Sequence, residues 1–264
     1  MLQESEIIPY HCSPPAGERI LVLAPHPDDE TLGCGGTIHL LVKAGKRVNV
    51  VFLTSGDKAD PSHTLSKTPA QNPGGFSNAP HITQYALLRE QEAVSALNVL
   101  GVGEYAFLRF PDRELHGSSH PASDRIYSIV VSYVPDAIYS PSPVELNPDH
   151  RTSAGIALAL QRRMLESGMS ASLVFYEVTT PLRPNLLVDI TSVFSTKESA
   201  IEKYGSQLQL GRYLECITAI NTFRTLTTGG TGYIEAFWQM PEPLSNGEIA
   251  GWLGYSGVFP LRAS

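Results

Sequence analysis

The residues best suited to chemistry lie together near the N-terminus. Residues 24–36 read Ala-Pro-His-Pro-Asp-Asp-Glu-Thr-Leu-Gly-Cys-Gly-Gly and follow an apolar run, residues 20–23, that is typical of a buried strand. One imidazole, His26, and three carboxylates therefore crowd into the loop after this strand. In open α/β folds the loops at the carboxyl ends of parallel strands form the ligand site. The pattern predicts a metal-binding loop.

The spacing within this loop divides its side chains between two tasks. His26 and Asp29 are three residues apart, so both can turn onto one ion while Asp28 faces elsewhere. A catalytic zinc takes three nitrogen or oxygen ligands from the protein and keeps an open position. The best third donor is His150, in the stretch Pro-Asp-His that follows another apolar run. Two imidazoles and one carboxylate suit zinc better than calcium or magnesium.

Asp28 is adjacent to the ligand pair and is not needed for coordination, so we interpret it as a general base. The alternative without a function is that residues 26–30 form a solvated acidic turn. A histidine at a helix start, such as His150, is by itself more often structural than a ligand. Asp149 either orients an imidazole through a hydrogen bond or caps the helix.

Short apolar runs alternate with longer amphipathic stretches along the chain, which is typical of βα repeats. We predict a Rossmann-like α/β fold with a mostly parallel sheet and helices on both faces. The expected strands lie near residues 19–24, 47–54, 104–109, 136–140, 172–178 and 186–190, and the expected helices near 35–44, 83–100, 123–134, 152–166 and 196–210.

The 264 residues suit a single domain with insertions. Residues 57–82 lack periodicity and are rich in turn formers, so they predict a long loop and a candidate substrate lid. Residues 211–264 form a C-terminal extension whose structure the pattern does not define. Gly33 to Gly36 lack the dinucleotide-binding pattern and are interpreted as close packing, with Cys34 a packed residue rather than a nucleophile.

The composition narrows the class of protein. A formal net charge of -7 argues against a nucleic-acid backbone as partner. The acidic N-terminus does not resemble a secretory signal, and no apolar run approaches the ~18 residues that a membrane span needs. Three scattered cysteines predict neither a disulfide framework nor a zinc ribbon. We therefore expect a cytoplasmic protein.

Several separated blocks together resemble one known family. The His-Pro-Asp-Asp-Glu block and the later Pro-Asp-His, with Leu-Arg-Glu-Gln-Glu-Ala at 88–93 and Phe-Pro-Asp-Arg at 110–113, are similar to the LmbE/PIG-L zinc-dependent N-acetylglucosaminyl deacetylases. The resemblance covers about residues 19–208. It implies an enzyme that removes an acetyl group from an N-acetylglucosamine-containing small molecule, by attack of zinc-bound water on the amide carbonyl.

The same resemblance implies roles for individual residues: His26, Asp29 and His150 hold Zn²⁺, Asp28 is the general base, and Arg89 and Asp112 face the substrate. An alternative for Arg89 is a surface pair with Glu92, three residues further along the same helix. The expected partner is an amino-sugar conjugate. A homo-oligomer is compatible with such folds, although no feature of the sequence sets its size.

One position departs from the family pattern. The family commonly has His-Pro-Asp-His where this chain has Asn147-Pro-Asp-His150, and the first histidine of that motif usually stabilises the oxyanion. The amide of Asn147 can still donate a hydrogen bond to an oxyanion. His116 and His120 are alternative donors. Two other functions remain as alternatives. One is a zinc-bearing carbohydrate-binding or regulatory protein whose catalysis is weakened or lost with the Asn147 replacement, and the other is a hydrolase of a different acyl amide.

Overall fold

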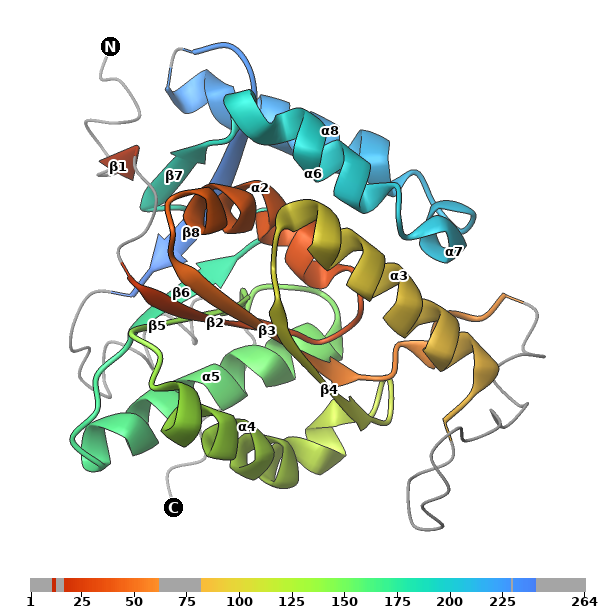
Figure 1. The fold of residues 1–264 in the computed structure, drawn as a ribbon. Coiled ribbons are helices and arrows are strands. Elements are labelled where there is room, and N and C mark those ends of the chain that lie inside the picture. The colour runs from red at the N-terminus through yellow and green to blue at the C-terminus, as the bar shows by residue number, and fades with distance from the viewer. Residues whose placement is uncertain (1–10, 13–16, 62–81, 229, 241–264) are drawn as a thin grey trace.

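The computed structural model describes residues 11–12, 17–61, 82–228 and 230–240, and within them eight strands form one sheet in the order β1-β7-β8-β6-β5-β2-β3-β4 (Figure 1). The strands are β1 (His11–Cys12), β2 (Arg19–Ala24), β3 (Arg47–Thr54), β4 (Glu104–Phe110), β5 (Ala137–Pro141), β6 (Ser172–Tyr176), β7 (Leu186–Asp189) and β8 (Ile234–Gln239). The neighbouring strands pair in parallel, except that β8 is antiparallel to both β6 and β7. The predicted mostly parallel sheet is confirmed.

Helices cover both faces of this sheet, as predicted (Figure 1). One layer holds α2 (Asp29–Lys43), α3 (Gln84–Leu100), α6 (Phe194–Ile201), α7 (Gly205–Leu208) and α8 (Tyr213–Phe223), and the other holds α4 (Ser119–Tyr133) and α5 (Pro148–Glu166). Short 3₁₀ helices are η1 (Asp57–Ala59), η3 (Leu115–Ser118), η4 (Thr191–Val193) and η5 (Arg224–Thr227). The central strands are buried on both sides, so each layer has its own apolar cluster.

Helix α2 begins at Asp29, six residues before the start that the sequence predicts. The glycine-rich stretch lies inside the helix because Cys34 (φ -140°, ψ 22°) breaks the regular winding without ending the helix. After the break, the free N–H groups of Gly36 and Thr37 donate to the buried carboxylate of Glu235 at 2.9 and 2.8 Å. A carboxylate from β8 thus caps the second half of α2.

The glycines around this break confirm the close packing that the sequence predicts. A Cβ atom at Gly33 would lie 2.3 Å from the ring of Tyr176, and one at Gly36 would lie 2.7 Å from Ile190. Cys34 is fully buried, and burial raises the pKa of its thiol. Cys34 is therefore a packed residue and not a nucleophile.

Other helix boundaries also differ from the predicted ones, and α4, for example, starts at Ser119 rather than Ser123. Helix α5 starts at Pro148 rather than Thr152, because the side chain of Asn147 accepts the N–H of Asp149 and so caps the helix earlier. The helix predicted over residues 196–210 is divided into α6 and α7. These boundaries matter because α5 carries His150.

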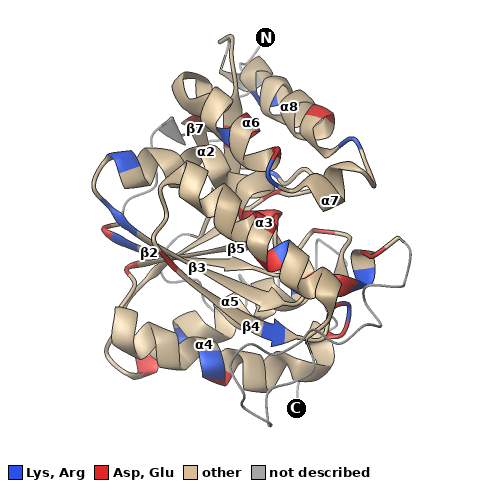
Figure 2. Ribbon diagram, turned by 45° about the vertical axis from the view of Figure 1, so that its right-hand side comes forward, with Lys and Arg blue, Asp and Glu red and all other residues tan. Residues whose placement is uncertain are grey.

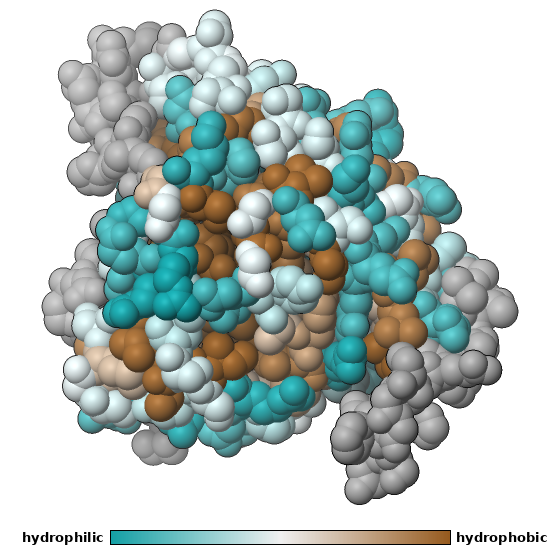
Figure 3. All heavy atoms as spheres, in the orientation of Figure 1, coloured by the Kyte–Doolittle hydropathy of each residue, from teal (hydrophilic) through white to brown (hydrophobic). Residues whose placement is uncertain are grey.

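The C-terminal extension supplies α8 and β8 up to Gln239, and residues 241–264 lie outside the described residues. The lid predicted over 57–82 also lies largely outside them, since only residues 57–61 and 82 are described. In the part of the chain that is described, no helix is long and apolar enough to cross a membrane. Acidic and basic residues are interspersed over the ribbon in Figure 2, and Figure 3 shows apolar and polar residues mixed on the face seen in Figure 1.

Candidate metal centre and active site

The strand order reverses between β2 and β5, and this switch point positions the candidate site. From β2 the chain moves outward through β3 and β4, whereas β5 and β6 lie on the other side of β2. The crevice beyond the carboxyl ends of strands at such a point is where open α/β sheets bind ligands. His26 follows β2 and His150 lies in the first turn of α5, just after β5. The topology therefore brings together residues that are 124 positions apart.

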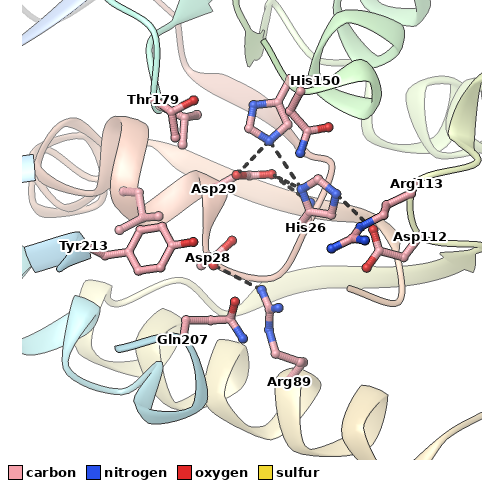
Figure 4. Close-up of a pocket in the computed structure, with 13 residues that line it drawn as sticks. His26, Asp28, Asp29, Arg89, Asp112, Arg113, His150, Thr179, Gln207 and Tyr213 are labelled. Carbon is pink, nitrogen blue, oxygen red and sulfur yellow. Dashed lines mark hydrogen bonds and ion pairs between the residues drawn. The ribbon is translucent and has the colours of Figure 1, made fainter. Parts of the chain in front are cut away.

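His26, Asp29 and His150 converge as predicted (Figure 4). His26 Nδ1 lies 3.0 Å from Asp29 Oδ2, His150 Nε2 lies 3.1 Å from Asp29 Oδ1, and the two imidazole nitrogens are 3.3 Å apart. All three residues are buried or nearly so. Two nitrogen donors and a carboxylate that face one point form a set that a catalytic metal ion with an open position would accept.

The outer nitrogen of each imidazole faces a carboxylate. His26 Nε2 lies 3.3 Å from Asp112 Oδ1 and 3.4 Å from Asp149 Oδ2, and His150 Nδ1 lies 3.4 Å from Glu145 Oε2. Such contacts fix the tautomer and the orientation of metal-binding histidines. Of the two roles that the sequence leaves open for Asp149, orienting an imidazole is the one that agrees with this placement.

His26, Asp112 and Asp149 also lie close enough together to hold an ion. Their carboxylates, however, already accept peptide N–H groups: Asp149 those of Arg113 and Leu115 at 2.7 and 3.2 Å, and Asp112 that of Lys58 at 2.9 Å. The group with two imidazoles is therefore the better candidate for a metal site, and these carboxylates would support it.

Glu145 is a site residue that sequence reasoning missed. Its buried carboxylate accepts the N–H groups of Val178, Thr179 and Thr180 at 2.7 to 3.3 Å and the hydroxyl of Thr179 at 2.8 Å. It thereby ties the loop before α5 to the loop after β6 while it faces His150. A single glutamate in a loop is not part of any periodic pattern. The only sequence signal that could have identified it is its position five residues before His150.

The electrostatics of the cluster fit a cation. Burial tends to raise the pKa of Asp29, but the facing imidazoles of His150 and His26 outweigh burial and hold it well below its usual range. Burial tends to lower the pKa of His150, yet the charge of Asp29 and hydrogen bonds raise it to about 9. The surroundings thus favour extra positive charge between these side chains, and a bound metal ion would supply it.

Asp28 is held apart from the three ligands by an unusual backbone conformation. Its φ of 143° lies in a region that residues other than glycine rarely adopt. Its Oδ2 lies 3.1 Å from Arg89 Nη2 (Figure 4). Burial raises the pKa of Asp28 to about 6, although the charge of Arg89 opposes this rise. A carboxylate with such a pKa suits proton transfer near neutral pH.

Arg89 lies beneath the pocket and is only 2% exposed, so the surface pair with Glu92 is wrong. Besides Asp28, its guanidinium donates to the carbonyl oxygens of Gly56, at 3.1 Å, and Pro27. Glu92 instead accepts the N–H and the hydroxyl of Ser206. Arg89 therefore joins the loops after β2 and β3, and it lines the pocket through the same group.

With this geometry in place, the relationship to known proteins is clear. The family described as PIG-L, GlcNAc-PI de-N-acetylase, matches residues 21–160, which is more than half of the chain. The chain belongs to the PIG-L family. The predicted family and the predicted enzyme class, an N-deacetylase, are confirmed.

Individual relatives of this PIG-L protein agree. It is 27% identical over 205 residues to a diacetylchitobiose deacetylase of Thermococcus kodakarensis, covering 72% of this chain and 70% of the relative. The N,N'-diacetylchitobiose deacetylase structure from Pyrococcus horikoshii superimposes with a TM-score of 0.69 at 26% identity, covering 85% of this chain and 84% of that one. The predicted fold class is thereby confirmed.

The fold alone does not decide the reaction. The 4-carboxy-2-hydroxymuconate hydratase of Pseudomonas putida also superimposes with a TM-score of 0.69, at 20% identity, over 86% of this chain and 99% of that one. That likeness shows a shared fold and nothing further. The reaction of this PIG-L protein has to be argued from its site residues.

The pocket of this PIG-L protein includes residues beyond the matched segment. Its lining residues are His26, Asp28, Asp29, Leu32, Arg89, Asp112, Arg113, Asn147, His150, Val178, Thr179, Gln207 and Tyr213. Gln207 and Tyr213 come from α7 and α8, and Figure 4 shows them on the side of Asp28 away from His26. The C-terminal part of the chain therefore forms one wall of the site.

The position that departs from the family pattern lies at the same pocket. Asn147 Oδ1 accepts the N–H of Asp149 at 2.8 Å, so one end of its amide is committed to capping α5. Its Nδ2 group is the end that remains for a ligand. His116 and His120, the alternative donors, line a different cavity beside Thr152 and Ile156 of α5. They therefore do not replace Asn147.

Proposed function

We propose that this protein is a zinc-dependent hydrolase that removes the acetyl group from an N-acetylglucosamine-containing small molecule. The observation that carries the proposal is that the candidate metal ligands and the candidate base are separate side chains around one point in the pocket. His26, Asp29 and His150 face one another, while Asp28 lies beside them, paired with Arg89 instead of being turned into the ligand cluster. This arrangement supports a division into three metal ligands and a separate base for hydrolysis.

His26, Asp29 and His150 would hold the ion, and their donor set favours zinc over the oxygen-preferring calcium and magnesium. Zinc, when bound, supplies a Lewis acid that polarises the amide carbonyl and acidifies a water molecule. Every other task falls to side chains of the chain itself.

Asp28 accepts a proton from the attacking water as the new bond to the carbonyl carbon forms. The Nδ2 group of Asn147 donates a hydrogen bond to the oxygen that becomes negatively charged. Asp28 then returns the proton to the leaving nitrogen as the C–N bond breaks, so acetate and a free amine leave the site. The buried Arg89 favours the charged form of Asp28 before and after this transfer.

The substrate part of the proposal rests on the relatives and on the lining of the pocket. The related enzymes are named for N-acetylated glucosamine compounds. The pocket is polar, and a carboxylate such as Asp112, which lines it, is suited to accept hydrogen bonds from sugar hydroxyls. We assign Asp112 to that contact in addition to its support of His26.

Acetate release tests this function. Purified protein is offered N-acetylglucosamine, N,N'-diacetylchitobiose and methyl N-acetylglucosaminide, and both acetate and free amine are measured. We expect equimolar products, loss of activity with a chelator and recovery with added zinc. D28N should bind stoichiometric zinc but release no acetate, whereas H26A/H150A should lose the zinc.

The same experiment separates the competing functions. Glycan binding without acetate release in zinc-loaded protein would overturn hydrolysis in favour of a binding or regulatory role. Release of other acyl groups, but not acetate, from the same sugars would identify a hydrolase of a different acyl amide. Full activity of D28N would remove Asp28 as the base.

A further inference from the structure

Arg113 places a positive charge at the rim of the pocket. It follows Asp112 in the loop between β4 and η3, is exposed to solvent and lines the pocket. Figure 4 draws it together with His26 and Asp112 among the residues that line the pocket. Among the described residues, its backbone N–H has a partner, but no side chain or carbonyl group pairs with its guanidinium.

The backbone of Arg113 is held by Asp149, a buried carboxylate that faces His26. Its φ of 61° lies in the left-handed region, which L-residues avoid. Its N–H donates to Asp149 Oδ2 at 2.7 Å, and the N–H of Leu115 donates to Asp149 Oδ1 at 3.2 Å. Asp149 is 1% exposed and lies 3.4 Å from His26 Nε2. Arg113 is therefore held at a fixed place relative to the candidate ligands.

The other charges that line the pocket are already balanced. Asp28 pairs with Arg89, and Asp29 faces both imidazoles. Asp112 faces His26 and accepts the N–H of Lys58. The guanidinium of Arg89 is committed to Asp28 and two carbonyl oxygens. Of the two arginines that line the described pocket, Arg113 is thus the one whose charge remains available to a ligand.

Depth within the pocket indicates which part of a substrate Arg113 meets. Asp29 and His150 are each 3% exposed, so the acetamide group has to enter deeply to reach them. Arg113 lies at the exposed rim, where the part of the molecule that is attached to the amino sugar would emerge. A guanidinium presents a planar fork of donors that matches a carboxylate or a phosphate, and it gains less from neutral hydroxyl groups.

We propose that Arg113 binds an anionic group, a carboxylate or a phosphate, on the substituent that the amino sugar carries. The inference rests on the proposed deacetylase function and narrows its substrate class to acidic conjugates. Arg113 acts here as a specificity-determining residue: it favours binding of the charged conjugate and takes no part in the proton transfers.

Matched glycosides test this role. The carboxymethyl glycoside of N-acetylglucosamine is compared with its carbamoylmethyl analogue, which has nearly the same shape but no charge. N-acetylglucosamine 1-phosphate is compared in the same way with the methyl glycoside. In the wild-type protein we expect roughly tenfold or greater preference in KM for at least one anionic member of a pair, with similar kcat values, because charge-assisted hydrogen bonds are the stronger ones.

Variants assign the preference to the guanidinium. R113Q should raise KM for the preferred anionic glycoside to about that of its neutral partner, and it should change KM for the neutral glycoside much less. R113K should retain part of the preference, because lysine keeps the charge without the fork. R162Q is the matched control, since Arg162 is an exposed arginine of α5 that pairs with Glu166 outside the pocket. We expect it to behave like the wild type.

Each possible result either supports the role of Arg113 or overturns it. Equal KM values for both members of each pair in the wild type would overturn the proposal, as would a preference that persists in R113Q, because the anion would then bind the metal or another group. If none of the glycosides releases acetate, the deacetylase function fails separately. Calorimetry with the intact glycosides then decides on Arg113: preferential binding that R113Q abolishes supports it, and equal binding overturns it.

Discussion

Asp28 Oδ2 and Arg89 Nη2 lie 3.1 Å apart in the buried layer beneath the pocket. Burial of Asp28 favours its neutral form, whereas the arginine favours the charged form that can accept a proton. The balance leaves the pKa of Asp28 at about 6. If Asp28 is the base, as proposed, burial and Arg89 together set the pH range in which it is available.

The acidic limb of the pH profile tests this pairing. Protonated Asp28 cannot act as a base, so kcat/KM should fall as the pH drops through its pKa. R89M removes the opposing charge, and we expect the limb to move to higher pH. R89K keeps a charge and should move it less. An unchanged limb in folded R89M, with folding checked by circular dichroism, would contradict the pairing.

Glu145 should control metal affinity rather than catalysis. It faces His150 Nδ1 at 3.4 Å and is held by peptide N–H groups on the opposite side. E145Q keeps an acceptor for those groups but removes the charge, so we expect zinc affinity to fall by about 10–100-fold. Competition with a chromophoric chelator measures this change. E166Q, at an exposed position of α5, serves as control.

Activity at saturating zinc separates this role from a catalytic one. E145Q should then recover most of the wild-type kcat, because the ligand cluster is refilled. Wild-type zinc affinity in E145Q would show that Glu145 only connects the two loops.

Two functions of Asn147 can be separated by substitution. N147D and N147S both retain a side-chain oxygen that caps α5, but neither retains the amide N–H group. If that group stabilises the oxyanion, kcat should fall by about 10²–10³ in both variants while thermal stability changes little. Steady-state kinetics and thermal melts measure the two effects. Wild-type kcat in N147S would confine Asn147 to capping.

The ion pair between Lys197 and Glu235 should matter for stability. Both side chains are fully buried, 2.7 Å apart, and Asn221 accepts from Lys197 at 3.0 Å. K197M leaves the charge of Glu235 buried without its counterion, so we expect a loss of about 3–5 kcal/mol in the free energy of unfolding. Urea denaturation measures it.

An exposed pair provides the comparison. Removing the pair between Arg162 and Glu166 on α5 should cost less than about 1 kcal/mol. A similar small cost for K197M would show that water or relaxation compensates the buried carboxylate. The double variant K197M/E235Q should regain part of the loss, since no charge is then left buried.

The sequence predicts those parts of the structure that depend on a pattern of neighbouring residues. The strands at 19–24 and 47–54 coincide with β2 and β3, because each contains an apolar run that lies in a sheet covered on both faces. The convergence of His26, Asp29 and His150 followed from strand ends and from family resemblance.

Other features depend on contacts between distant segments and leave no local pattern. Strand β8 lies between β6 and β7 and runs antiparallel to both. No sequence pattern near residue 234 indicates these neighbours. The cap on the second half of α2, after the break at Cys34, comes from Glu235, about 200 residues further along the chain. Burial of Arg89 was similarly hidden, because its partners lie in other loops.

The break in α2 has a consequence for the order in which the site is made. The turn that carries Asp29 is joined at Cys34 to a second helical segment whose N–H groups depend on Glu235 of β8. During synthesis, all three candidate ligand residues leave the ribosome well before Glu235 has been added to the chain. A growing chain therefore carries the donor atoms before the structure that orients them has formed. We expect the metal to bind only after synthesis of the chain is complete.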